Sequence, residues 1–362
     1  MKKSLAFLCA LALSASALFG CSGSQGASAN SAAETTTEAQ TTAAETTAEE
    51  TTAVSDVTEN DAAMNIMALK GPTAMGMVEF MNAADSGELT DGTYNFTIAA
   101  SADEVTPKIV KGEADIAAVP ANLASVLYNN TEGGVKVLAV NTLGVLYIVE
   151  NGEGGVSSVA DLKGKTIYAS GKGATPEYAL NYILKENGID PETDVTIEWK
   201  SEHAECLAAL LADENSVAML PQPFVTTAQM KNENVKVALD LTKEWDQIQA
   251  DEANPSALIT GVVIARTAYM EDHPEAISAF LTHYQDSVTF VNSDVTAAAA
   301  LVGKYDIVPE AVALQAIPAC NITFITNTEM KDKLSGYLNV LFEQNPKSVG
   351  GELPADDFYY TW

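Results

Sequence analysis

Two glycine-containing turns carry the residues best suited to binding a ligand. Gly71 and Thr73 follow one apolar, strand-like run, Gly173 and Thr175 follow another, and a helix-like stretch comes after each turn. The first N–H groups of a helix have no partner within the helix, so together with the threonine hydroxyls they can bind an anionic or polar group. Ordinary capping of the helix by either threonine is the alternative interpretation.

Amide side chains follow other strand-like runs. Asn122 lies just after the run 115–119, and Gln222 and Phe224 lie just after the run 216–220. In open α/β sheets ligands bind beyond the carboxyl ends of the strands, although Asn122 and Gln222 could equally be helix caps. The predicted ligand-binding residues are Gly71, Pro72, Thr73, Ala74, Met75, Asn122, Asn141, Gly173, Ala174, Thr175, Gln222 and Phe224.

The sequence contains few residues that could form a catalytic or metal centre. The three histidines, His203, His273 and His283, are too few and too scattered for a metal-ligand spacing. Cys206 and Cys320 lack a Cys-x-x-Cys partner and are predicted to be two buried free thiols. No phosphate loop or dinucleotide-binding fingerprint is complete. We therefore expect a binding protein with no catalytic residue, no metal ion and no cofactor.

Strands and helices alternate along the chain around these turns. Strands are predicted at 64–69, 94–100, 115–119 and 135–140, with helices after the first turn and at 103–111 and 121–128. The order then repeats, with strands at 165–169, 195–199 and 216–220 and helices at 177–187, 203–212 and 224–231. This pattern predicts an α/β protein with two related lobes, each a mostly parallel sheet flanked by helices.

The remaining segments predict how the two lobes are joined. Runs 144–149 and 260–265 bracket the second lobe and are expected to form a two-strand hinge. Apolar stripes after Pro274 and around Met330 predict helices that complete the first lobe. The predicted domains are therefore residues 61–150 with 260–362 as a discontinuous first lobe, and residues 151–259 as the second lobe.

The first sixty residues have the pattern of an export signal and a tether. Lys2 and Lys3 precede an uncharged run that is too short for a membrane-spanning helix. The run ends in LFGC, which resembles a bacterial lipobox, so we predict a signal peptide at 1–20 and a lipidated Cys21; plain secretion with cleavage near Ala17 is the alternative. Residues 21–60, rich in Ser, Thr, Ala and Glu, are predicted to be that lipidated cysteine and a disordered tether.

The charge of the chain excludes several classes of partner. A net charge of −30 argues against nucleic-acid binding and against adsorption to anionic lipid. Leaving out the seven acidic residues and two lysines of residues 1–60 leaves 42 acidic and 17 basic residues, a net charge of −25 from Asp61 onward. Arg266 is the only arginine, so a pocket built from several arginine forks is excluded.

Together these features resemble a substrate-binding lipoprotein of an ABC importer, in the nitrate, sulfonate and taurine branch that also includes thiamine-pyrimidine binding proteins. Beyond the Cys21 lipobox and its tether, the motifs that carry the resemblance are 70–73 (KGPT), 112–117 (GEADIA) with 119–120 (VP), 161–165 (DLKGK), 220–224 (LPQPF) and 273–275 (HPE). The resemblance covers residues 61–362. It implies a type II periplasmic-binding-protein fold, in which two lobes close on a small solute and deliver it to a permease.

The resemblance also implies partners and a location. We expect a monomer that binds a small-molecule solute, works with an importer permease and its ATPase, and reaches the membrane only through its lipid anchor. That anchor would hold it on the outer face of a bacterial cytoplasmic membrane, or on the periplasmic side of a membrane. An extracellular sensor without transport remains an alternative, as does an enzyme on the same fold, similar to pyrimidine synthases or chorismate dehydratases. Because the chain has no arginine before Arg266, a neutral or cationic solute is at least as consistent with the sequence as an anionic solute.

Overall fold

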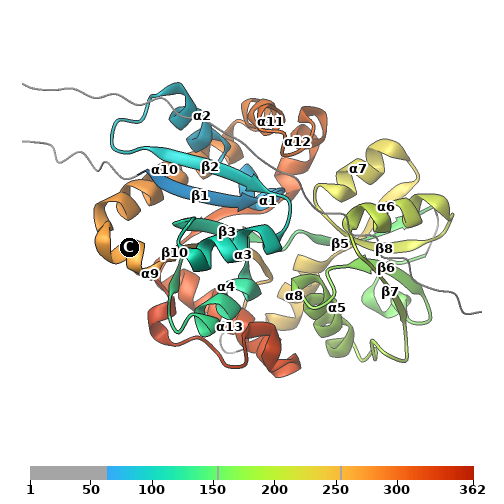
Figure 1. The fold of residues 1–362 in the computed structure, drawn as a ribbon. Coiled ribbons are helices and arrows are strands. Elements are labelled where there is room, and N and C mark those ends of the chain that lie inside the picture. The colour runs from blue at the N-terminus through green and yellow to red at the C-terminus, as the bar shows by residue number, and fades with distance from the viewer. Residues whose placement is uncertain (1–62, 153–154, 253–254) are drawn as a thin grey trace, which may run out of the picture. The chain divides into compact units, whose positions relative to one another are not determined.

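The computed structural model describes residues 63–152, 155–252 and 255–362, so the predicted signal peptide, Cys21 and the tether lie outside the described residues. The described residues belong to one compact unit. They form a sheet of six strands and a sheet of five strands, each with helices packed beside it (Figure 1). Among these residues no helix is both long enough and apolar enough to cross a membrane.

The six-stranded sheet takes its strands from two distant parts of the chain. Its order is β11-β4-β10-β3-β1-β2. Strand β1 pairs in parallel with β2 and β3, whereas β10 is antiparallel to β3 and β4, and β11 is antiparallel to β4. The bounds are β1 Met64–Leu69, β2 Tyr94–Ala99, β3 Ile116–Pro120, β4 Val135–Leu143, β10 Ile259–Arg266 and β11 Ile322–Ile325.

The five-stranded sheet is continuous in sequence and has the order β7-β6-β8-β5-β9. Strand β6 is parallel to β7 and β8, and β5 is antiparallel to β8 and β9. The bounds are β5 Leu146–Asn151, β6 Thr166–Ser170, β7 Thr196–Lys200, β8 Val217–Pro221 and β9 Val235–Asp240.

Strand direction agrees with the sequence prediction in most strands, whereas the hinge differs from it. Strands β1 to β4 run in one direction in the six-stranded sheet, and β6 to β9 do so in the five-stranded sheet, so each sheet is mostly parallel in strand direction. The strands that run against the others are β10 and β11 in the first sheet and β5 in the second. The predicted hinge strands are not paired with each other, because β5 lies within one sheet and β10 within the other. The chain thus enters the second sheet at Leu146, before the boundary predicted at residue 150; the division into lobes stays a prediction.

Helices pack beside both sheets. Those around the five-stranded sheet are α5 Thr175–Glu186, α6 His203–Ala212, α7 Phe224–Lys231 and α8 Leu241–Gln249. The others are α1 Pro72–Met75, α2 Val78–Ser86, α3 Ala102–Lys111, α4 Ala121–Asn130, α9 Thr267–Asp272, α10 Pro274–Ser293, α11 Val295–Lys304, α12 Glu310–Ala316 and α13 Asn327–Gln344. Four short 3₁₀ helices occupy Val159–Leu162, Ile317–Ala319, Pro346–Val349 and Asp356–Phe358. Helices α6 and α7 and strand β1 have the predicted bounds, while β9, β11, α8, α9, α11 and α12 were not predicted.

One apolar cluster joins the elements that hold the candidate site. It contains Val119 of the six-stranded sheet, Ile167 of the five-stranded sheet, and Leu334 and Tyr337 of α13. Helix α13 contacts both α4 and α5, so it lies against elements of each sheet. The residues that follow β3 and those that follow β6 are therefore positioned against each other by α13.

Candidate ligand-binding site

The first glycine turn begins the short helix α1 after β1. Gly71 has a φ of 132° and a ψ of −156°, a backbone conformation that is open essentially only to glycine. Thr73 is buried, and its hydroxyl donates to the carbonyl oxygen of Leu69 at 2.8 Å. Ala74 and Met75 are fully buried, and the Met75 sulfur lies 3.9 Å from the Cys320 sulfur. The side chains of Ala74 and Met75 are therefore not suited to a polar ligand, and the backbone N–H groups of both residues donate to the carbonyl oxygen of Gly71.

Asn141 and Gly261 hold the first turn against the sheet. Asn141 is buried, and its Nδ2 donates to the carbonyl oxygen of Thr73 at 3.4 Å. A Cβ at Gly261 of β10 would lie 2.6 Å from both Asn141 Oδ1 and Thr73 Cγ2. Glycine is thus required at 261, because the turn approaches the strand more closely than any side chain would allow.

The second glycine turn begins α5 and reaches elements of the other sheet. The buried Thr175 hydroxyl donates to Asn122 Oδ1 at 3.5 Å, the long end of the hydrogen-bond range, and accepts from the Tyr337 hydroxyl at 3.1 Å. Asn122 in turn donates from Nδ2 to the carbonyl oxygen of Ser348 at 3.3 Å. The predicted residues Asn122 and Thr175 are therefore brought together in a buried polar cluster with Tyr337, which the sequence analysis assigned only to an apolar helical stripe.

The amide of Gly173 already has a carboxylate partner. Its N–H donates to Glu177 Oε2 at 2.6 Å, a charge-assisted bond within the first turn of α5. Ala174 is the residue at the N-terminal cap position of α5, and its own N–H donates to the carbonyl oxygen of Gly171. The backbone N–H groups of Gly173 and Ala174, two of the three residues predicted to bind a ligand at the second turn, thus donate to protein oxygens.

Gln222 and Phe224 lie at the start of α7. Gln222 Oε1 accepts from the backbone N–H of Thr226 at 3.3 Å and from its hydroxyl at 2.9 Å, so this side chain caps the helix. The half-buried Phe224 ring lies 5.3 Å from the His203 ring, measured between centroids. Gln222 therefore acts as a helix cap, as the alternative interpretation predicted. Phe224 forms an aromatic contact between α7 and α6, two helices beside the five-stranded sheet.

Sequence reasoning missed a polar pair beside Phe224. Ser170 Oγ lies 2.5 Å from His203 Nδ1, where β6 ends and α6 begins. Burial lowers the pKa of His203, which favours the neutral ring. The position of Ser170 at a strand end was the available signal, but nothing in the local sequence links it to a histidine that follows the next strand. Among the described residues no group of three or more His, Cys, Asp or Glu side chains could hold a metal ion.

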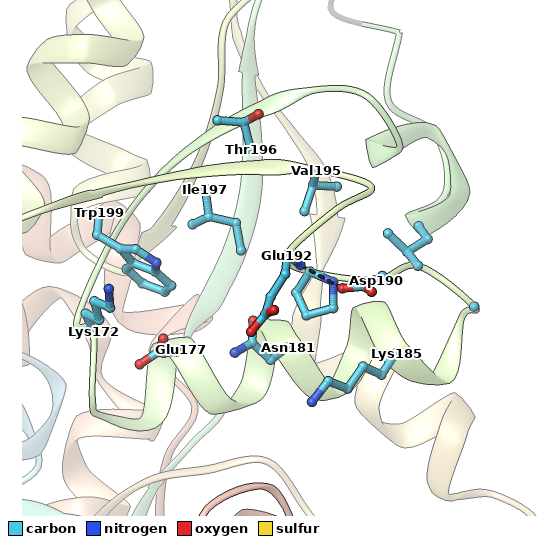
Figure 2. Close-up of a pocket in the computed structure, with 13 residues that line it drawn as sticks. Lys172, Glu177, Asn181, Lys185, Asp190, Glu192, Val195, Thr196, Ile197 and Trp199 are labelled. Atoms are coloured by element: carbon cyan, nitrogen blue, oxygen red, sulfur yellow. Dashed lines mark hydrogen bonds between the residues drawn. The ribbon is translucent and has the colours of Figure 1, made fainter.

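A pocket of about 960 Å³ lies beside the second turn, between α5 and β7 (Figure 2). None of the predicted ligand-binding residues lines it. Glu177 projects into it from α5 and Trp199 from β7 (Figure 2). Its polar and charged lining includes Lys172, Glu177, Asn181 and Lys185.

The only arginine forms an ion pair away from the candidate site. Arg266 Nη2 lies 2.7 Å from Asp115 Oδ1, and its Nε donates to the carbonyl oxygen of Ala114 at 3.1 Å. Gly261 of the same strand pairs with Pro120, whereas Ala265 pairs with Ile116. Arg266 therefore lies at the amino end of β3, opposite the end from which Asn122 follows, and it is not available to a ligand beside Thr73 or Asn122.

Comparison with known proteins assigns the family. Residues 87–306 match the family described as ABC transporter, phosphonate, periplasmic substrate-binding protein. The chain belongs to this family. Its members are the periplasmic substrate-binding components of ABC importers, which capture a solute for a permease; the family is one of binding proteins and not of enzymes. No curated protein matches this substrate-binding protein.

Solved structures confirm the type II fold. An ABC transporter from Parabacteroides distasonis is 22% identical, with a TM-score of 0.69, covering 83% of this chain and 99% of its own. The aliphatic sulphonate binding protein SsuA from Escherichia coli is 17% identical, with a TM-score of 0.65 and coverages of 83% and 92%. The nitrate-binding protein NrtA from Synechocystis PCC 6803 is 12% identical, with a TM-score of 0.58 and coverages of 83% and 84%. The predicted family resemblance and two-sheet α/β fold are thus confirmed.

Proposed function

We propose that this substrate-binding protein captures a small solute between its two sheets, at the two glycine turns, and delivers it to a permease driven by an ATPase. The observation that carries this proposal is the buried cluster of Asn122, Thr175 and Tyr337, which joins helices from both sheets. Polar side chains buried at such a junction are costly unless they are paired, so their presence supports a recognition role.

The same cluster supports a clamp mechanism. The Thr175 hydroxyl is held by partners that belong to α4 and α13, beside the six-stranded sheet, whereas Thr175 itself begins α5. Separating the two sheets would break both hydrogen bonds and expose Asn122 and Thr175 to solvent. A solute that replaces these bonds would favour one arrangement of the two sheets, and a permease could distinguish the two arrangements.

We further propose that the protein is a monomer anchored by lipid at Cys21, with residues 22–60 as a tether. The lipobox-like LFGC sequence and the acidic Ser, Thr, Ala and Glu composition support this assignment. The Cys21→Ala variant is expected to leave the membrane fraction and appear in the soluble extracytoplasmic fraction. Retention of that variant in the membrane would contradict lipid anchoring.

Solute binding by the full chain tests the clamp. Thermal-shift measurements would screen phosphonates, sulfonates, nitrate, amino acids and polyamines, because a ligand at a hundredfold excess over its Kd adds about 2.7 kcal/mol of stability. The double variant Thr73→Ala, Thr175→Ala should then weaken binding of the solute found by tenfold or more. The matched control is Thr289→Ala, since the Thr289 hydroxyl donates to the carbonyl oxygen four residues earlier, as that of Thr73 does, but at an exposed position of α10. An unchanged affinity in the double variant would refute the proposed site.

A further inference from the structure

The hydrogen-bond donors of the proposed site are largely used by the protein itself. The Thr73 hydroxyl donates to a backbone carbonyl oxygen, as does one N–H of each amide of Asn122 and Asn141. The Thr175 hydroxyl donates to Asn122 Oδ1. An anionic ligand is recognised by donors, and each hydroxyl has only one hydrogen to give. An anion would therefore have to break protein hydrogen bonds to be held by the two threonine hydroxyls.

A protein carboxylate occupies the start of α5. Glu177 Oε2 accepts the Gly173 N–H at 2.6 Å, at the positive end of the helix dipole where a bound anion would be expected. Glu177 also lines the pocket beside α5, opposite Trp199 (Figure 2). Any solute that approaches the second turn through this pocket meets a negative charge that already fills the anion position.

Cations do not compensate for this carboxylate. Arg266 is bound to Asp115, and Lys70, which precedes the first turn, pairs with Asp306 at 3.3 Å. Lys172 and Lys185 line the same pocket and form no ion pair within the described residues, but both are exposed, where a single charge interaction is weak, and the acidic Asp190 and Glu192 line the pocket too. The net charge of −25 from Asp61 onward repels anions at longer range.

We infer that Glu177 is a specificity-determining residue that excludes anionic solutes and selects a solute carrying an amine or another hydrogen-bond donor. This inference rests on the proposed function, because it concerns the solute of that same site. It separates this chain from the sulphonate- and nitrate-binding proteins whose fold it shares, and from the phosphonate of the family description. Trp199 in the same pocket adds an aromatic face on which an organic cation can stack.

The test uses isothermal titration of the full chain with methylphosphonate, methanesulfonate and nitrate as anions, and with agmatine, choline and spermidine as cations. Glu177→Ala frees the Gly173 amide and is expected to raise the affinity for at least one anion tenfold or more. It should lower the affinity for any cation that the wild-type protein binds by a similar factor. Glu177→Gln, which keeps an acceptor for Gly173 but removes the charge, should change both affinities in the same directions by less. Glu186→Gln, in the last turn of α5, is the matched control and should change neither.

Two results would overturn the inference. One is a wild-type protein that binds an anion as tightly as Glu177→Ala does, and the other is an anion affinity that is unchanged in both Glu177 variants. Failure of the proposed site looks different, because the Thr73→Ala, Thr175→Ala variant would then leave the affinity unchanged for whichever solute binds. The anion gain in Glu177→Ala decides the question even where the wild-type protein binds none of the six probes.

Discussion

Removal of the single arginine should destabilise the protein through the carboxylate that it leaves behind. The Asp115 side chain is 7% exposed and that of Arg266 is 24% exposed, with 2.7 Å between Oδ1 and Nη2. Asp115 Oδ2 also accepts the backbone N–H of Asn65 at 2.9 Å, so this one carboxylate ties β1, β3 and β10 together. Replacing Arg266 with Met keeps most of the side-chain volume but leaves Asp115 buried without a cation.

The expected cost follows from this burial. Breaking a buried ion pair by removing one partner costs about 3–5 kcal/mol, and the partial exposure of Arg266 places the expected value near the lower end, at about 3 kcal/mol. For a chain of this size that loss corresponds to a fall in melting temperature of roughly 4–5 °C. Urea unfolding followed by circular dichroism, with thermal melting of the same samples, would measure both quantities.

Two further variants make the result interpretable. Adding Asp115→Asn to Arg266→Met removes the unpaired charge and should recover more than half of the lost stability. Lys108→Met breaks an exposed pair with Glu113, 3.1 Å apart, and should change the melting temperature little. A cost for Arg266→Met no larger than that of Lys108→Met would refute the structural role assigned to the arginine.

Three further variants test other features of the fold. A Cβ at Gly144 would lie 2.1 Å from Thr242 Oγ1, so Gly144→Ala should lower the free energy of unfolding by about 1–3 kcal/mol in urea titrations; an unchanged value would show that the chain between the sheets can relax. Hydrogen bonds from two serines lower the pKa of Asp161 to about 2 from 3.8, so its stabilising contribution is present above pH 3.8 and is lost as the pH falls through 2. Asp161→Asn should therefore flatten the melting temperature between about pH 4 and pH 2, and an unaltered slope would contradict this. Burial lowers the pKa of His203 from 6.5, so the stability that depends on its neutral ring is present above pH 6.5 and is lost below it; His203→Gln should reduce that loss in melts at different pH values, and an equal loss in both proteins would count against it.

The two-sheet α/β fold could be predicted because buried strands are continuous apolar runs that end at glycine or proline. β1, whose sequence is MNIMAL, has the predicted bounds, and β3 and β8 differ from the prediction by one residue at each end. β9 was missed because it is an edge strand in which only Val235 and Leu239 are buried, and the exposed Lys236 interrupts its apolar run. The reversed direction of β5, β10 and β11 could not be predicted from such runs, because it depends on the neighbours beside which each strand lies in the folded sheet.

The candidate site was predictable only in part. The glycine turns and Asn122 follow strand ends, a local pattern that the sequence displays directly. The contact of Asn122 with Thr175, and of Thr175 with Tyr337, joins residues far apart in the chain, which no local periodicity can indicate. Whether Gln222 was a cap or a ligand contact depended on the position of Thr226, which the structure supplies.

The sequence by itself determined which groups are available to a site: one arginine, three histidines and two glycine turns that begin helices. It also determined the net charge of −30. Composition limits which groups exist, whatever the fold. Only the tertiary structure decided how those groups are used, because hydrogen bonds and ion pairs depend on distances that folding sets. It placed Arg266 on Asp115 and the Glu177 carboxylate on the Gly173 amide, two contacts that the residue counts do not indicate.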